Sequence, residues 1–208
     1  MKKTPTKPQK ASKSLYSTHP GFSREPAFHR NLQERTGKTL DQWVAFVKKS
    51  GPPTERERRT WLKDQGLTTN YAHWIAASAA GTEMSVETYD PEALVEAMFS
   101  GPKAELLPIY EKLLKLGLSL GKDVIASPGK TMVALYRKRV FARITPTTRT
   151  RIDVQLALEE STKPTARLKD IQDKSKNRIN RQIGVTSVAE IDDEVKRLLK
   201  HAYDLESD

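Results

Sequence analysis

Capping signals followed by apolar stripes at helical spacing mark three short helices in the first half of the chain. In the first helix, Thr39 and Gln42 have the spacing of a capping box, and Trp43 lies in the stripe that follows. The third helix ends at Gly81, as glycine often does at a helix C-terminus. The pattern predicts a small N-terminal three-helix bundle over residues 31–82.

Two further helices come before a change of period. Pro91 suits the first turn of one helix, and Pro108 is tolerated only near the start of the other. Residues 130–158 then alternate apolar and polar side chains, as strands do, with two turn-like breaks. A fourth strand is predicted at residues 178–185. An apolar stripe at helical spacing within residues 188–203 predicts a final helix.

These elements predict an α+β fold overall. Residues 91–206 form an α+β domain in which helices cover an antiparallel sheet of three to four strands. Residues 1–28 lie before the bundle and are rich in Lys, Ser, Thr and Pro, with few side chains that suit a core. Such a segment buries too little surface to offset the entropy of ordering, so we expect a disordered basic tail.

The net charge of +10 is concentrated in two regions. Residues 1–30 carry seven basic side chains and one acidic, and residues 130–181 carry fourteen basic and five acidic. Residues 31–90 are balanced, with eight of each sign. Localised positive charge attracts phosphate-rich partners, although a basic tail also serves solubility alone.

The chain contains no cysteine, which excludes disulfides and thiolate metal sites and suits a reducing cytoplasm. No apolar run approaches the ~20 residues that a membrane-spanning helix needs. The N-terminal residues MKKTPTKPQK have the charge of a signal peptide but no apolar segment after them. We therefore expect a cytoplasmic protein without membrane association.

Arginines recur on the polar side of the predicted strands. Guanidinium groups hold phosphate or carboxylate through paired hydrogen bonds, and a sheet keeps such groups at fixed separations. With aromatic residues nearby, this face would suit nucleic acid through charge and stacking. An exposed sheet face also carries long polar side chains simply because it meets water. The candidate anion-binding residues are Lys138, Arg139, Arg143, Arg149 and Arg151.

The segment WLKDQGLTTNYAHWIA has the order of a helix-turn-helix. Its second helix would present Thr69, Asn70 and His73 to base edges in a major groove. Against this, residues 31–90 carry no net charge, whereas proteins that bind duplex DNA usually neutralise phosphates. The lysines of the tail would have to supply that charge, and many three-helix bundles do not bind DNA.

Catalytic patterns are weak. The four histidines lack the spacing of metal ligands. Residues 127–131, SPGKT, lack the upstream glycine and the following helix of a phosphate loop. Asp153 and the later Glu159 superficially resemble a nuclease pattern, but its lysine is missing, and pairing with a strand arginine explains Asp153 better. We therefore assign no catalytic residue, metal site or cofactor.

Two segments carry a family resemblance. The stretch TGKTLDQWVAFVKKSGPPTERERRTWLKDQGLTTNYAHWIA resembles a small bacterial helical domain, domain of unknown function 4287. The stretches LLPIYEKLLKLG, TMVALYRKRVFARITPTTRTRIDVQLAL and SVAEIDDEVKRLLKHAYD resemble domain of unknown function 5655. The resemblance rests on spacing and element order, and it supports the two-domain division. Relatives of the second family are sometimes labelled as transport proteins and sometimes occur beside nuclease-type domains, but neither label implies a mechanism.

Two functional hypotheses remain from the sequence. The first is a non-enzymatic cytoplasmic protein that binds a polyanion through its basic sheet face and basic tail, with nucleic acid as the favoured partner. The second is a small-ligand or protein-interaction module in which the sheet face and the final helix form a cleft. The first predicts binding that weakens steeply with salt, and the second predicts stabilisation by a metabolite.

Overall fold

The structure is a computed structural model that describes residues 14–18, 25–82, 89–171 and 178–207. The chain divides into two compact units. A helical unit spans Thr18–Tyr89, and an α+β unit combines Asp90–Asp208 with the N-terminal segment Met1–Ser17. The helical unit is therefore inserted, along the chain, between two parts of the α+β unit.

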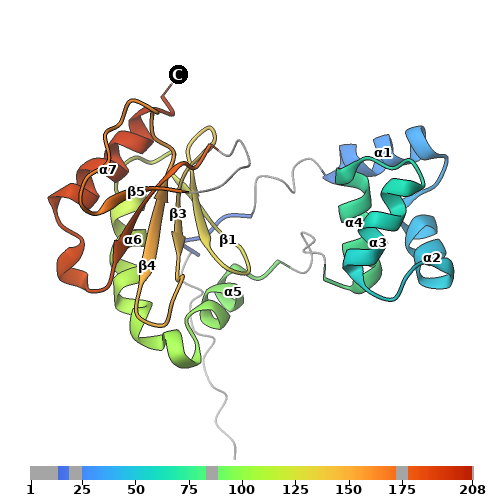
Figure 1. Cartoon of the computed structure of the whole chain (residues 1–208), viewed down its shortest axis with the longest axis horizontal. Coiled ribbons are helices and arrows are strands. Elements are labelled where there is room, and N and C mark those ends of the chain that lie inside the picture. Colours follow the sequence, from blue (N-terminus) through green and yellow to red (C-terminus); the bar gives the residue numbers. More distant parts are fainter. Residues whose placement is uncertain (1–13, 19–24, 83–88, 172–177, 208) are drawn as a thin grey trace, which may run out of the picture. The chain divides into compact units, whose positions relative to one another are not determined.

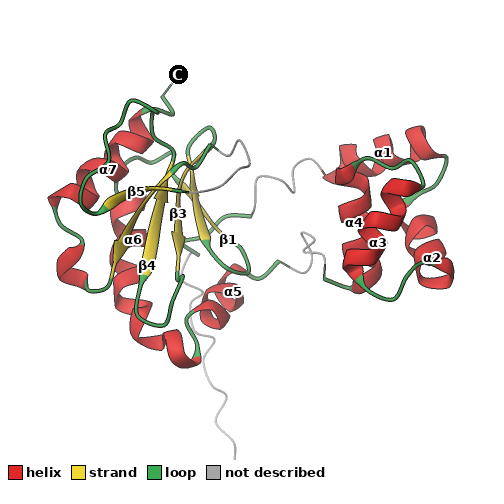
Figure 2. Ribbon diagram, in the orientation of Figure 1, coloured by secondary structure: helices red, strands yellow, loops and turns green. Residues whose placement is uncertain are grey.

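The described part of the helical unit consists of helices (Figure 2). The capping box expected at Thr39 is formed, and Thr54 and Glu57, which have the same spacing in the sequence, form a second one. Gly81 ends the last helix with a φ of 69°, a left-handed conformation that glycine adopts without strain. The helices are α1 (Glu25–Thr36), α2 (Leu40–Ser50), α3 (Glu55–Asp64) and α4 (Thr69–Ala80).

The bundle contains α1 in addition to the three helices predicted. The helix begins at Glu25, inside the segment expected to be a disordered tail. Phe28 and Leu32 lie one helical turn apart and are buried in the core, where Phe28 packs on Tyr71 and Trp74. A single apolar pair in a charged segment is too short a pattern to indicate a helix, and burial in the bundle stabilises it. Residues 1–13 and 19–24 of the predicted tail lie outside the described residues.

The α+β unit contains helices and an antiparallel sheet (Figure 1). The strand order is β1-β2-β3-β4-β6-β5. Pro108 lies in the first turn of α6, after a short 3₁₀ helix, as expected from the sequence. The elements are α5 (Pro91–Met98), η2 (Gly101–Leu106), α6 (Leu107–Leu118), β1 (Ile125–Pro128), β2 (Val133–Tyr136), β3 (Val140–Thr145), β4 (Ile152–Leu156), β5 (Leu168–Asp170), β6 (Arg181–Val185), η3 (Val188–Glu190) and α7 (Asp193–Asp204).

Helices α6 and α7 cover one face of this sheet (Figure 1). Leu135, Ile144 and Val154, from β2, β3 and β4, lie in one buried cluster with Leu113 of α6 and Leu198 of α7. The predicted fold class, α+β with helices covering an antiparallel sheet, is confirmed. We call the opposite side of the sheet the outer face.

The sheet has six strands rather than the three to four predicted. Both additional strands, β1 and β5, lie at the edges of the sheet. β1 ends in Pro128, and β5 has three residues, so neither shows a long alternation. Short strands and prolines are typical of sheet edges, where they weaken the sequence pattern.

The N-terminal segment packs on the α+β unit. The Tyr16 hydroxyl forms a hydrogen bond of 2.8 Å with the Tyr110 hydroxyl of α6, and the Ser17 N–H donates to the Ala126 carbonyl. Burial raises the pKa of both tyrosines. The predicted tail is thus ordered at residues 14–18, because one aromatic side chain reaches the core of the α+β unit.

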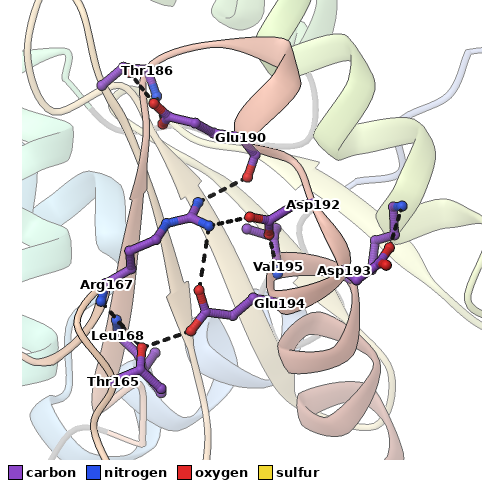
Figure 3. Close-up of polar contacts among 10 residues, drawn as sticks. Thr165, Arg167, Leu168, Thr186, Glu190, Asp192, Asp193, Glu194 and Val195 are labelled. Carbon is purple, nitrogen blue, oxygen red and sulfur yellow. Dashed lines mark hydrogen bonds and ion pairs between the residues drawn. The ribbon is translucent and has the colours of Figure 1, made fainter.

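Arg167 joins the edge of the sheet to the start of α7 (Figure 3). Its guanidinium forms ion pairs with Asp192 and Glu194 and donates to the Glu190 carbonyl. Asp192 is the N-cap of α7 and accepts from the Val195 N–H. The spacing of Ser187 and Glu190 in the sequence predicts a capping box, but Glu190 instead accepts from the N–H and hydroxyl of Thr186. The structure places the cap at Asp192.

This arrangement predicts loss of stability in acid. The Val195 N–H and, to a lesser extent, Arg167 hold the pKa of Asp192 below its usual value. The ionised carboxylate therefore stabilises the folded state above about pH 4, and this stabilisation is lost as the pH falls. Asp192→Asn keeps the cap but removes the titrating group, because Asn and Asp cap equally well. We expect the melting temperature of Asp192→Asn to fall less than that of the wild type between pH 6 and pH 3. Equal falls would contradict this assignment.

Candidate anion-binding surface

The turn between β2 and β3 carries two of the predicted anion-binding residues, Lys138 and Arg139. Both side chains contact the C-terminal end of the chain. The Lys138 ammonium donates to the Ser207 carbonyl at 3.1 Å, and Arg139 forms an ion pair of 3.1 Å with Glu206. Neighbouring Arg137 pairs with Asp123 at 2.6 Å. Arg137 and Arg139 are therefore already paired with carboxylates, whereas Lys138 donates to a backbone carbonyl.

Glu206 is the centre of this contact. It is fully buried and pairs with Arg178 as well as with Arg139. A buried carboxylate needs such partners because an unpaired buried charge is strongly unfavourable. Glu206 thus compensates the charge of Arg139, one of the two predicted residues at the β2–β3 turn.

Arg151 is also paired within the chain. Its guanidinium contacts both carboxylate oxygens of Asp153, with Nε 2.8 Å from Oδ1 and Nη2 3.3 Å from Oδ2. The Asp153 side chain is only 6% exposed, whereas Arg151 lies over it at the surface, 44% exposed. A Cβ at Gly184 of β6 would lie 2.9 Å from Arg151 Cδ, so the glycine makes room for the arginine. Arg151 thus forms an ion pair within the chain, and the Asp153 carboxylate is engaged in that pair rather than available as a catalytic base.

Arg143 lies at the centre of the outer face. Strand pairing places it in one row that crosses all six strands. The β1 and β2 members of this row are buried, and the members from β3 to β5 are partly or fully exposed. The row contains no carboxylate, and Arg143 has no acidic partner among the described residues. In spatial order the row is Ser127, Ala134, Arg143, Gln155, Gln182 and Lys169.

The exposed part of this row, from Arg143 to Lys169, is about 14 Å long because neighbouring strands lie about 4.8 Å apart. A cation stands at each end, with two amides between them. Half-buried Tyr136 lies close enough to Arg143 for its phenol to interact with the guanidinium charge: burial raises the pKa of Tyr136, and Arg143 opposes that rise. The outer face thus combines cations, amides and an aromatic ring.

Arg149 lies in the β3–β4 loop and is exposed. It has no acidic partner among the described residues, and it lines a cavity of 560 Å³ at one end of the sheet. Of the five predicted residues, Arg139 and Arg151 are paired with carboxylates, whereas Lys138, Arg143 and Arg149 have no carboxylate partner in the described part of the chain. Lys138 donates to a backbone carbonyl, Arg143 lies on the outer face, and Arg149 lines the cavity.

Comparison with known families agrees with the division of the chain into a helical unit and an α+β unit. The family model described as "Domain of unknown function (DUF5655)" matches residues 95–206, more than half of the chain. The chain belongs to this family. The model described as "Domain of unknown function (DUF4287)" matches residues 27–81. No curated protein and no solved structure matched the chain. Neither description states a function, so a function has to be argued from the geometry.

The DUF4287 part contains the proposed recognition helix, α4. Thr69, Asn70 and His73 are all exposed on its first turns. Most of the other α4 residues are buried. They lie in one core cluster with Phe28, Trp43 and Leu62, which come from the other three helices. A recognition helix contacts base edges with the residues of its first turns. The exposure of these three α4 residues, Thr69, Asn70 and His73, is compatible with that role, which stays a prediction.

Gln155 and Gln182, the two amides in the row of Arg143, were not among the predicted site residues. The alternation within β4 placed Gln155 on the polar side, but only the pairing of β4 with β6 brings Gln182 beside it. Lys169 was missed because β5 was not predicted. Within the described residues, no group of three or more His, Asp or Glu side chains is placed to hold a metal ion, and no helix is long and apolar enough to cross a bilayer.

Proposed function

We propose that the DUF5655 part binds single-stranded nucleic acid on its outer face, as a non-enzymatic binding module. The observation that carries the proposal is the row of Arg143, Gln155, Gln182 and Lys169, which has cations at both ends and no carboxylate. The cations suit phosphates, and the amides suit the hydrogen-bonding edges of bases.

A single strand fits this surface better than a duplex. Single strands are bound by grooves or sheets that combine positive charge with aromatic rings, and Tyr136 supplies a ring beside Arg143. Duplex readers insert a helix or ribbon into a groove, and the outer face is a sheet surface without such a projection. The basic residues of the N-terminal tail lie outside the described residues, and the proposal includes them as a second, sequence-based contact.

The proposal is tested by fluorescence anisotropy with labelled oligonucleotides that carry a 5′-hydroxyl. We expect the full chain to bind single strands more tightly than duplexes of the same length. Each phosphate contact contributes about −0.7 to the slope of log K against log salt for single strands, so Arg143 and Lys169 together predict at least about −1.4. Binding that does not change between two salt concentrations, or no binding at low salt, would remove the proposal.

A further inference from the structure

A cavity of 560 Å³ lies where the β1–β2 turn, the β3–β4 loop and the α5–η2 junction meet. Three cationic residues line it: Lys103, Lys130 and Arg149. Hydroxyl side chains fill much of the remaining wall, and none of its lining residues is acidic. Cations and hydroxyls without carboxylates are the groups that hold phosphate oxygens.

The wall is held in place by contacts within the chain. The Lys103 ammonium donates to the Pro146 carbonyl at 2.5 Å, which ties η2 to the β3–β4 loop. An ammonium has three N–H donors, so this bond leaves two for a ligand. The loop is fixed further by the Thr148 N–H, which donates to the Arg151 carbonyl, and by the Thr147 hydroxyl, which donates to the Thr145 carbonyl. Arg149 therefore projects from an ordered loop.

A second observation points to a ligand. Thr145 lines the cavity, and its Oγ1 is buried without a hydrogen-bond partner among the described residues. A buried polar atom without a partner costs free energy that a hydrogen bond would recover. Arg149 also lacks an acidic partner within the described part of the chain, so the wall has unused donors.

We infer that this cavity binds a phosphate monoester. The volume exceeds what inorganic phosphate fills and lies in the range of small-molecule sites, so there is room for the organic group. Ala97, Met98 and Pro102 provide an apolar side for that group. Arg149 and Lys103 hold the phosphate oxygens, and the cavity hydroxyls complete the hydrogen bonds. The inference rests on the cavity alone and does not depend on nucleic-acid binding by the outer face.

Two sources present this chemistry: a free nucleotide and the 5′-phosphorylated end of a nucleic-acid strand. Calorimetric titration of the full chain compares adenosine 5′-monophosphate with adenosine, and a 5′-phosphorylated oligonucleotide with its 5′-hydroxyl form. We expect tighter binding of the phosphorylated member of at least one pair. A gain confined to the oligonucleotide assigns the site to strand ends, and a gain for the nucleotide assigns it to free phosphate monoesters. Equal binding within both pairs overturns the inference.

Arg149→Gln is the decisive variant, because Arg149 is exposed and has no structural partner among the described residues. We expect it to weaken the phosphate-dependent gain about tenfold without changing the melting temperature. Arg149→Lys should retain part of the gain. Lys112→Gln, which removes one positive charge from α6 outside both the cavity and the outer face, should leave the gain unchanged. A wild-type gain in Arg149→Gln, or an equal loss of the gain in Lys112→Gln, contradicts the site.

Discussion

Arg143→Glu should weaken binding of a single-stranded oligonucleotide on the order of 10- to 30-fold at low salt, because it removes a charge-assisted phosphate contact and introduces repulsion. Arg143→Gln should have a smaller effect on affinity and should reduce the salt slope by about 0.7. Neither change should alter the melting temperature, since Arg143 has no acidic partner among the described residues. Fluorescence anisotropy at several salt concentrations measures both quantities.

Arg139→Gln is the charge-matched control. It removes one positive charge from the same unit, but Arg139 is already paired with Glu206. We expect its affinity for the oligonucleotide to stay within about threefold of the wild type, since long-range effects are screened at physiological salt. If Arg139→Gln and Arg143→Gln lose affinity equally, the total charge governs binding, and the outer face has no specific role.

The fold was predictable where a local pattern agreed with the tertiary structure. Capping boxes at Thr39 and Thr54 and the glycine at Gly81 marked three helices correctly. The elements that were missed, α1, β1 and β5, are stabilised by contacts from distant parts of the chain. Phe28, for example, is buried by residues of α4 that are more than 40 positions away. Such contacts leave little periodicity in the segment itself.

The candidate site was predictable only in part, for a related reason. The alternation in β3 and β4 placed Arg143 and Arg151 on the polar side of the strands, but it does not distinguish a binding cation from a paired one. That difference depends on Gly184, which comes from β6 and allows Arg151 to lie over Asp153. Likewise, Arg139 is neutralised by Glu206 from the C-terminal end of the chain.

The basic region thus contains arginines with two physical roles. Arg139 and Arg151 compensate carboxylates that are nearly or fully buried, and their contribution is to stability. Arg143 and Arg149 meet no carboxylate in the described residues, and their charge is available to a ligand. The two roles can be told apart by measurement. Replacing a paired arginine should lower the free energy of unfolding, and replacing an unpaired one should lower the affinity for the ligand.

Arg151→Gln should therefore lower the free energy of unfolding of the α+β unit by about 2 kcal/mol, because it leaves the Asp153 carboxylate buried without its partner. The value is set below the range for fully buried pairs because Arg151 is partly exposed and its charge is screened by solvent. All three tryptophans, Trp43, Trp61 and Trp74, lie in the helical unit. In urea, the far-ultraviolet circular dichroism transition should move while the tryptophan fluorescence transition stays in place.

Two further variants identify the cause. Asp153→Asn combined with Arg151→Gln should recover much of the lost stability, because no buried charge then remains unpaired. Gly184→Val should reproduce the loss with both charged residues intact, since even a Cβ at this position lies 2.9 Å from Arg151 Cδ and displaces the guanidinium. Arg143→Gln, which removes an unpaired arginine from the same face, should leave both transitions unchanged. If Arg151→Gln is as stable as Arg143→Gln, the Arg151–Asp153 pair is not structural, and Arg151 returns to the candidates for ligand binding.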